Sequence, residues 1–250
     1  DVMTRAGAPI RLLLVHGSRL NSASWIPLEE ALLGRIVCHH VDLPGHGLAT
    51  ELPFTMEGAL EAVSGGVAEL DPGRHRVVLA GHSLGGYVAM EWAAQHHMVL
   101  SGLVLMGSTA QPSSRLAGVY RAMGSALRAG LGDERRAAQI RETDAASLRR
   151  IIGERTADAV LERGPGLAAI PDAWDAVIDE VDLRSLTEVD VPILAINGEF
   201  DQFRVGEGMA RRLRQDLEIV HVPGATHFAP MTHPAPVARA IAEFVSGLPA

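Results

Sequence analysis

The chain has 250 residues, of which 47% are hydrophobic, and a formal net charge of −8 at pH 7. This length fits one large α/β domain or two small ones, and the acidic balance makes nucleic acids and anionic membrane surfaces poor partners. All 22 basic residues are arginine, which excludes lysine-based catalysis, and the single cysteine, Cys38, excludes an internal disulfide.

Short apolar runs predict strands that alternate with helices. The strands are expected at 12–15, 36–41, 77–80, 102–106, 192–196 and 217–222. The helices are expected at 25–33, 56–70, 83–97, 208–214 and 236–245. Ser24 is the candidate N-cap of the first helix. This alternation predicts an α/β fold with a doubly wound, mostly parallel sheet flanked by helices.

Residues 109–187 interrupt the alternation. Apolar residues recur there at helical spacing, with one helix expected to start at Asp144 and another after Pro171. We therefore expect a helical insertion at 109–187. The core domain would consist of residues 1–108 and 188–250.

Ser83 lies in the turn after the third predicted strand, within the sequence Gly81-His82-Ser83-Leu84-Gly85. Glycines on both sides of a G-x-S-x-G turn let strand and helix approach closely and expose the serine hydroxyl above a helix N-terminus. Small-residue turns also produce this pattern by chance. The interpretation of Ser83 as a nucleophile therefore depends on its context, a strand before it and a helix after it.

Two further polar residues follow the last two predicted strands. Asp201 lies in the loop after the fifth strand and His227 in the loop after the sixth. The carboxyl ends of parallel strands meet at one edge, so both should lie near Ser83. His227 would accept the serine proton, and Asp201 would fix its tautomer. Glu199 is a rival acid, but we expect it to bond to backbone or neighbours instead.

Other residues fit the remaining parts of an acyl-transfer site. The backbone N–H groups of Ser18 and Leu84 are the candidate oxyanion hole. Arg19 could reach a substrate carboxylate, although a solvent-facing arginine is the commoner case. Candidate pocket residues, which fit an ordinary core equally well, are Met123, Trp174, Val177 and Phe228. The histidines form no metal-ligand pattern, and the mechanism requires neither a metal nor another cofactor.

Taken together, these motifs resemble those of the α/β-hydrolase superfamily over almost the whole chain. The similar segments are His16-Gly17, Asp42-Leu43-Pro44-Gly45-His46-Gly47, the turn around Ser83, Gly198-Glu199-Phe200-Asp201 and Gly224-Ala225-Thr226-His227-Phe228. The resemblance implies a triad of Ser83, Asp201 and His227. It also implies a mobile helical cap, or lid, which the insertion at 109–187 matches. Serine at position 83 argues against haloalkane dehalogenases and epoxide hydrolases, which have an aspartate there.

This resemblance implies a serine hydrolase that cleaves a carboxylic ester, thioester or lactone through an acyl-enzyme on Ser83. Its partner would be a small molecule with an acyl group. Two alternatives stay open, because fold alone does not set function. One is a C–C bond hydrolase or lyase of the menaquinone-precursor type, and the other is a non-catalytic ligand receptor. With no long apolar stretch and no leader-like N-terminus, we expect a cytoplasmic protein without a membrane partner.

Overall fold

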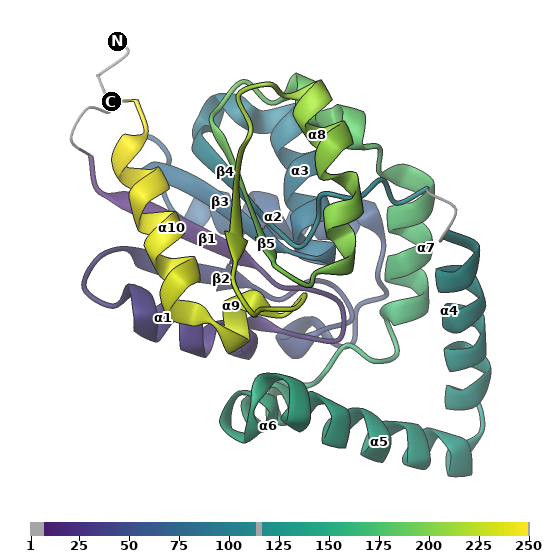
Figure 1. Cartoon of the computed structure of the whole chain (residues 1–250). Coiled ribbons are helices and arrows are strands. Elements are labelled where there is room, and N and C mark those ends of the chain that lie inside the picture. Colours follow the sequence, from purple (N-terminus) through teal and green to yellow (C-terminus); the bar gives the residue numbers. More distant parts are fainter. Residues whose placement is uncertain (1–7, 114–116, 250) are drawn as a thin grey trace.

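The computed structural model describes residues 8–113 and 117–249 of the chain (Figure 1). Its six strands are β1 (Ile10–Val15), β2 (Val37–Val41), β3 (Arg76–His82), β4 (Leu100–Met106), β5 (Ile193–Gly198) and β6 (Glu218–Val222). They form one parallel sheet in the order β2-β1-β3-β4-β5-β6. The order in which strands are added reverses between β1 and β3, where sheets of this kind bind ligands.

Helices cover both faces of the sheet (Figure 1). One face carries α2 (Met56–Glu69), α3 (Leu84–His96) and α8 (Glu207–Leu213), and the other carries α1 (Ile26–Leu32) and α10 (Pro234–Gly247). Successive strand residues enter opposite cores, as Leu13 and Leu14 do. Burial on both faces explains why these strands are continuous apolar runs. The predicted α/β fold with a mostly parallel sheet is confirmed.

The first predicted helix is divided into two elements. A 3-10 turn, η1 (Ser22–Trp25), precedes α1, and the Asn21 side chain caps it by accepting a hydrogen bond from the Ala23 N–H. The Ser24 hydroxyl donates to the Asn21 carbonyl instead, so the prediction of Ser24 as the N-cap is wrong. Pro27 stands in the first turn of α1, where its missing N–H has no cost.

Among the described residues, four α-helices lie between β4 and β5: α4 (Ala117–Leu131), α5 (Glu134–Ile152), α6 (Glu154–Arg163) and α7 (Ile170–Glu180). Helix α5 begins earlier than predicted, because the Asp133 side chain accepts a hydrogen bond from the Arg136 N–H and caps it. Asp144 lies in the middle of this helix, so the predicted start at Asp144 is wrong. Gly153, with a φ of 82°, separates α5 from α6.

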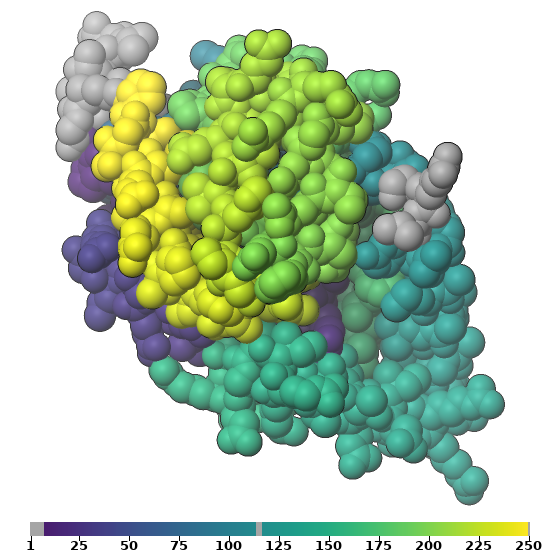
Figure 2. Space-filling view, viewed as in Figure 1, coloured from purple at the N-terminus to yellow at the C-terminus, as the bar shows by residue number. Residues whose placement is uncertain are grey.

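A small apolar cluster joins α5 and α6 to the rest of the molecule. It combines side chains of both helices with Leu20, in the loop after β1, and Met231 of α9 (Ala229–Thr232). The segment with α5 and α6 runs along the lower edge of the molecule, next to the yellow C-terminal part (Figure 2). Among the described residues, no helix combines the length and the apolar character that crossing a membrane requires.

Candidate active site

Ser83 occupies the sharp turn between β3 and α3. Its φ of 52° and ψ of −118° are rare for a residue with a side chain. A Cβ atom on Gly81 would overlap the Gly85 carbonyl, and one on Gly85 would overlap the carbonyl oxygen of Val15. The Ser83 N–H donates to the Met106 carbonyl over 2.8 Å. Close backbone packing thus fixes the hydroxyl at the N-terminus of α3, where the helix dipole favours negative charge.

Asp201 and His227 meet in the loops after β5 and β6. Asp201 Oδ2 lies 3.0 Å from His227 Nδ1, and Oδ1 accepts the Phe203 N–H over 2.9 Å. Burial opposes ionisation of Asp201, but the interactions with His227, the Phe203 N–H and His82 together outweigh burial and lower the pKa of the carboxyl. The carboxylate therefore holds the proton of His227 on Nδ1, and Nε2 is left as a proton acceptor.

The rival acid has a different partner. Glu199 Oε2 accepts a hydrogen bond from the Gly224 N–H over 2.8 Å, so this carboxylate holds the loop after β6 by its backbone. The contact that the Asp201 carboxylate makes with His227 favours Asp201 over Glu199 as the partner of the imidazole.

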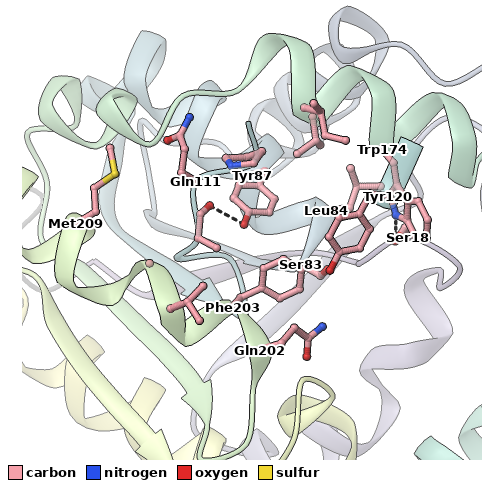
Figure 3. A pocket seen from close by; sticks show the side chains of 16 residues that line it. Ser18, Ser83, Leu84, Tyr87, Gln111, Tyr120, Trp174, Gln202, Phe203 and Met209 are labelled. Atoms are coloured by element: carbon pink, nitrogen blue, oxygen red, sulfur yellow. Dashed lines mark hydrogen bonds between the residues drawn. The ribbon is translucent and has the colours of Figure 1, made fainter. Parts of the chain in front are cut away.

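Ser83 lies between two adjoining chambers at the carboxyl edge of the sheet. The larger chamber has a volume of about 230 Å³ and extends from Ser83 and Leu84 to Val205 and Met209 (Figure 3). The smaller chamber, of about 190 Å³, includes His227. Residues that border both chambers are Ser18, Ser83, Tyr120, Trp174, Gln202 and Phe203. The arrangement offers space on two sides of the candidate nucleophile.

Polar groups on the far wall of the larger chamber already have partners. The Tyr87 hydroxyl donates to the Ala110 carbonyl over 2.8 Å (Figure 3). The Gln111 side chain accepts from the Leu183 N–H and donates to the Ser113 hydroxyl, each over 2.9 Å. A polar group of a ligand placed there would lose its water without gaining these bonds. The larger chamber therefore suits an apolar group.

The structure brings together most of the predicted pocket residues. Trp174 lines both chambers and donates its Nε1–H to the Ser18 hydroxyl over 3.3 Å, and Phe228 lines the smaller chamber. Met123 lines neither, and its side chain is 53% exposed. The physical reason is that α4 turns Gly124 toward α7, which directs the neighbouring Met123 to solvent.

Several lining residues were not singled out from the sequence, namely Tyr120, Ile178, Gln202, Phe203, Val205 and Met209. Phe203 follows Asp201 by two positions, so its proximity to the site could have been read from the loop. The same holds for Gln202 and Val205, which lie in that loop. For the residues on α4, α7 and α8, helical spacing gives a buried face but not the neighbour that covers it.

Arg19 differs from the solvent-facing arginine that was the commoner expectation. Its side chain is 19% exposed, its Nε lies 2.7 Å from Asp144 Oδ1 on α5, and its Nη2 donates to the Asp144 carbonyl over 3.0 Å. Burial raises the pKa of the Asp144 carboxyl despite the attraction of Arg19. Arg19 also lines the smaller chamber and has a φ of 69°. The residue therefore connects the loop after β1 with an inserted helix.

Two buried histidines next to the site are neutral. Burial, followed by the charge of nearby His227, lowers the pKa of His82 to about 3. Its Nε2–H therefore donates to the His227 carbonyl over 2.9 Å. Burial, followed by neighbouring His46, also lowers the pKa of His16 to about 3, and its Nε2 accepts the Leu43 N–H over 3.0 Å. His82 thus holds the backbone of His227 without adding positive charge.

Within the described residues, neither a metal-binding cluster nor a reactive thiol offers an alternative to the site around Ser83. In the ranges 8–113 and 117–249, no three His, Cys, Asp or Glu side chains gather in a way that could hold a metal ion. Cys38 is a free thiol on β2, where burial, followed by the charge of Glu29, raises its pKa to about 12. A thiol with so high a pKa is a poor nucleophile.

Comparison with known proteins gives a consistent result. The chain matches the model of the Alpha/beta hydrolase family over residues 12–240. It is 27% identical to the pimeloyl-[acyl-carrier protein] methyl ester esterase of Edwardsiella ictaluri, over 94% of this chain and 93% of that protein. It is 26% identical to the 2-(acetamidomethylene)succinate hydrolase of Mesorhizobium japonicum, over 98% and 91% of the two chains. The structure of a thermophilic esterase from Thermogutta terrifontis with malate bound aligns with a TM-score of 0.77 at 25% identity, over 96% of this chain and 90% of that chain.

Proposed function

The chain belongs to the α/β-hydrolase family and is a hydrolase, and we propose that it cleaves carboxylic esters through an acyl-enzyme on Ser83. The observation that carries this proposal is the 3.0 Å contact between Asp201 and His227 at the edge where the strained turn exposes Ser83. The esterase names of several relatives support an ester as the substrate. Thioesters and lactones react by the same chemistry and belong to the proposed class.

Each step of this reaction has a residue to perform it. Ser83 Oγ attacks the carbonyl carbon while His227 Nε2 accepts the hydroxyl proton. The N–H groups of Ser18 and Leu84 stabilise the resulting oxyanion. The tetrahedral intermediate then breaks its bond to the leaving oxygen, which takes the proton from His227. Water attacks the acyl-enzyme by the same route, releases the carboxylic acid and restores Ser83.

The position of His227 assigns the two halves of the ester to the two chambers. The leaving oxygen must lie within hydrogen-bond reach of His227 in order to receive its proton. The leaving group therefore occupies the smaller chamber, which His227 lines. The acyl group then occupies the larger chamber, where the polar wall groups are already satisfied. Apolar acyl chains or rings are thus the expected acyl groups.

The inserted helices form the roof of this site in our proposal. Residues 109–187 would be a cap domain over a core of 1–108 and 188–250. Support comes from Tyr120 and Trp174, which border both chambers from α4 and α7.

Ser83→Ala tests the proposal with a chain-length series of p-nitrophenyl esters. We expect cleavage to be lost in a folded variant, while Ser125→Ala, which changes an exposed serine of α4, keeps it. A fluorophosphonate should label the wild type and Ser125→Ala but not Ser83→Ala. Undiminished turnover by folded Ser83→Ala would refute the acyl-enzyme. A folded wild type that is inert toward the esters and the probe would favour a C–C bond hydrolase, a lyase or a ligand receptor.

A further inference from the structure

Arg19 has a position that its contact with α5 does not explain. It follows Ser18, whose N–H we assign to the oxyanion hole, and it lines the smaller chamber, as His227 does. Among the described residues that line this chamber, Arg19 carries the one permanent positive charge, and none of them is an aspartate or a glutamate. Its left-handed backbone, with a φ of 69°, is unfavourable for a residue with a side chain. Such strain is typical of residues with a functional task.

The ion pair with Asp144 leaves part of the guanidinium free. Nη2 donates to the Asp144 carbonyl, and Nε lies 2.7 Å from Asp144 Oδ1 without the geometry of a hydrogen bond. Nη1 makes no hydrogen bond with any described residue. Arg19 therefore lines the chamber and has N–H donors on Nη1 that a ligand could use.

We propose that the smaller chamber binds a leaving group that bears a carboxylate, and that Arg19 Nη1 donates a hydrogen bond to this carboxylate. The inference rests on the proposed function, because proton delivery by His227 is what assigns the leaving group to this chamber. A carboxylate there would make a charge-assisted hydrogen bond with a guanidinium that is largely buried, and such bonds are about twice as strong as neutral ones. The natural substrate would then be an ester of a hydroxy acid with an apolar acyl group.

Other arginines show what a purely structural contact looks like in this fold. Arg155 of α6 pairs with Glu30 of α1 over 2.6 Å, also between an inserted helix and the core. The Arg155 side chain is 72% exposed and lines neither chamber. A contact that only attaches a helix needs neither a strained backbone nor a place in a chamber. Arg155→Gln is therefore the matched control for changes at Arg19.

The test uses two esters that differ in one charge, the butanoyl esters of 3-hydroxybenzoate and 3-hydroxybenzamide. Their acyl groups and rings are identical, and the measured quantity is the ratio of kcat/KM for the carboxylate ester to that for the amide ester. Arg19→Gln should lower this ratio about tenfold, the effect of one charge-assisted hydrogen bond. Arg155→Gln should keep the wild-type ratio. An unchanged ratio in Arg19→Gln would overturn the inference.

Asp144→Asn separates the binding role from simple attachment of α5. This change removes the carboxylate that competes for Arg19, so the preference for the carboxylate ester should rise above that of the wild type. If Arg19 only attaches α5, both variants should instead lose activity on the two esters in parallel, which would contradict the inference. Cleavage of the amide ester by the wild type reports the proposed function independently. An enzyme that cleaves neither ester and resists the fluorophosphonate would overturn both proposals.

Discussion

The carboxyl edge of the sheet and two of the inserted helices, α4 and α7, border the chambers, but different interactions hold the edge and the inserted segment. At the edge, backbone packs on backbone: Gly81 and Gly85 have no room for a side chain, and the Ser83 N–H bonds to the neighbouring strand. The inserted helices are attached by side chains, such as the pairs of Arg163 with Asp42 and of Arg155 with Glu30. The edge is therefore the more rigid of the two.

This difference suggests that the edge of the sheet determines the rate of the reaction and that the inserted helices determine which substrate is bound. Reacting groups must keep their geometry to a fraction of an ångström, and the strand ends provide it. An exposed ion pair such as that of Arg155 with Glu30 contributes about 0–1 kcal/mol, so a side-chain change in the inserted segment can cost little stability. Relatives whose names give different substrates are compatible with this division of roles. Changes at the edge should thus affect the rate, and changes in the helices should affect which ester is cleaved.

The largest effect is expected at the edge itself. His227→Gln keeps a side chain of similar size but removes the base that we propose, so kcat should fall by about 10⁴-fold. The KM of esters should change little, because the chamber walls remain. Steady-state kinetics on a p-nitrophenyl ester measure both quantities, with circular dichroism to verify folding. A loss of less than about tenfold would show that another group accepts the serine proton.

A smaller effect is expected where the helices join the core. Asp42 accepts hydrogen bonds from the N–H groups of Ser22 and Leu48 and from Arg163. Burial opposes its ionisation, but these bonds outweigh burial and lower its pKa to about 2. Because the folded-state pKa lies below the unfolded value, the carboxylate stabilises the protein near neutral pH. This stabilisation is lost as the pH falls from about 4 to about 2.

Asp42→Asn makes this contribution measurable. With allowance for solvent screening, the variant should lose about 1–2 kcal/mol of unfolding free energy at pH 7. Urea denaturation at pH 7 and at pH 3 should give a smaller difference between variant and wild type at the lower pH. An equal difference at both values would mean that Asp42 acts through its shape and not through its charge.

The same contrast explains what the sequence could predict. Local rules determine the turn at Ser83, and the parallel sheet alone brings Asp201 and His227 to one edge. The surroundings of the inserted helices depend on distant partners. Asp144 has the residue type of an N-cap, yet it lies within α5, because Asp133 caps that helix and Arg19 binds Asp144 from 125 residues away. The spacing of apolar residues along a helix does not show which distant side chain will bind a polar residue on it.

The smallest effect is expected in the wall of the larger chamber. Ile178 and Met123 both lie on inserted helices, but Ile178 lines the chamber and Met123 faces solvent. Ile178→Ala should lower kcat/KM about fivefold for acyl chains long enough to contact it, because apolar contact is lost. Chains too short to reach Ile178 should be cleaved as before. Met123→Ala should leave the whole chain-length profile within about twofold of the wild type, as is usual for surface changes. Equal profiles for the two variants would place the acyl group outside the larger chamber.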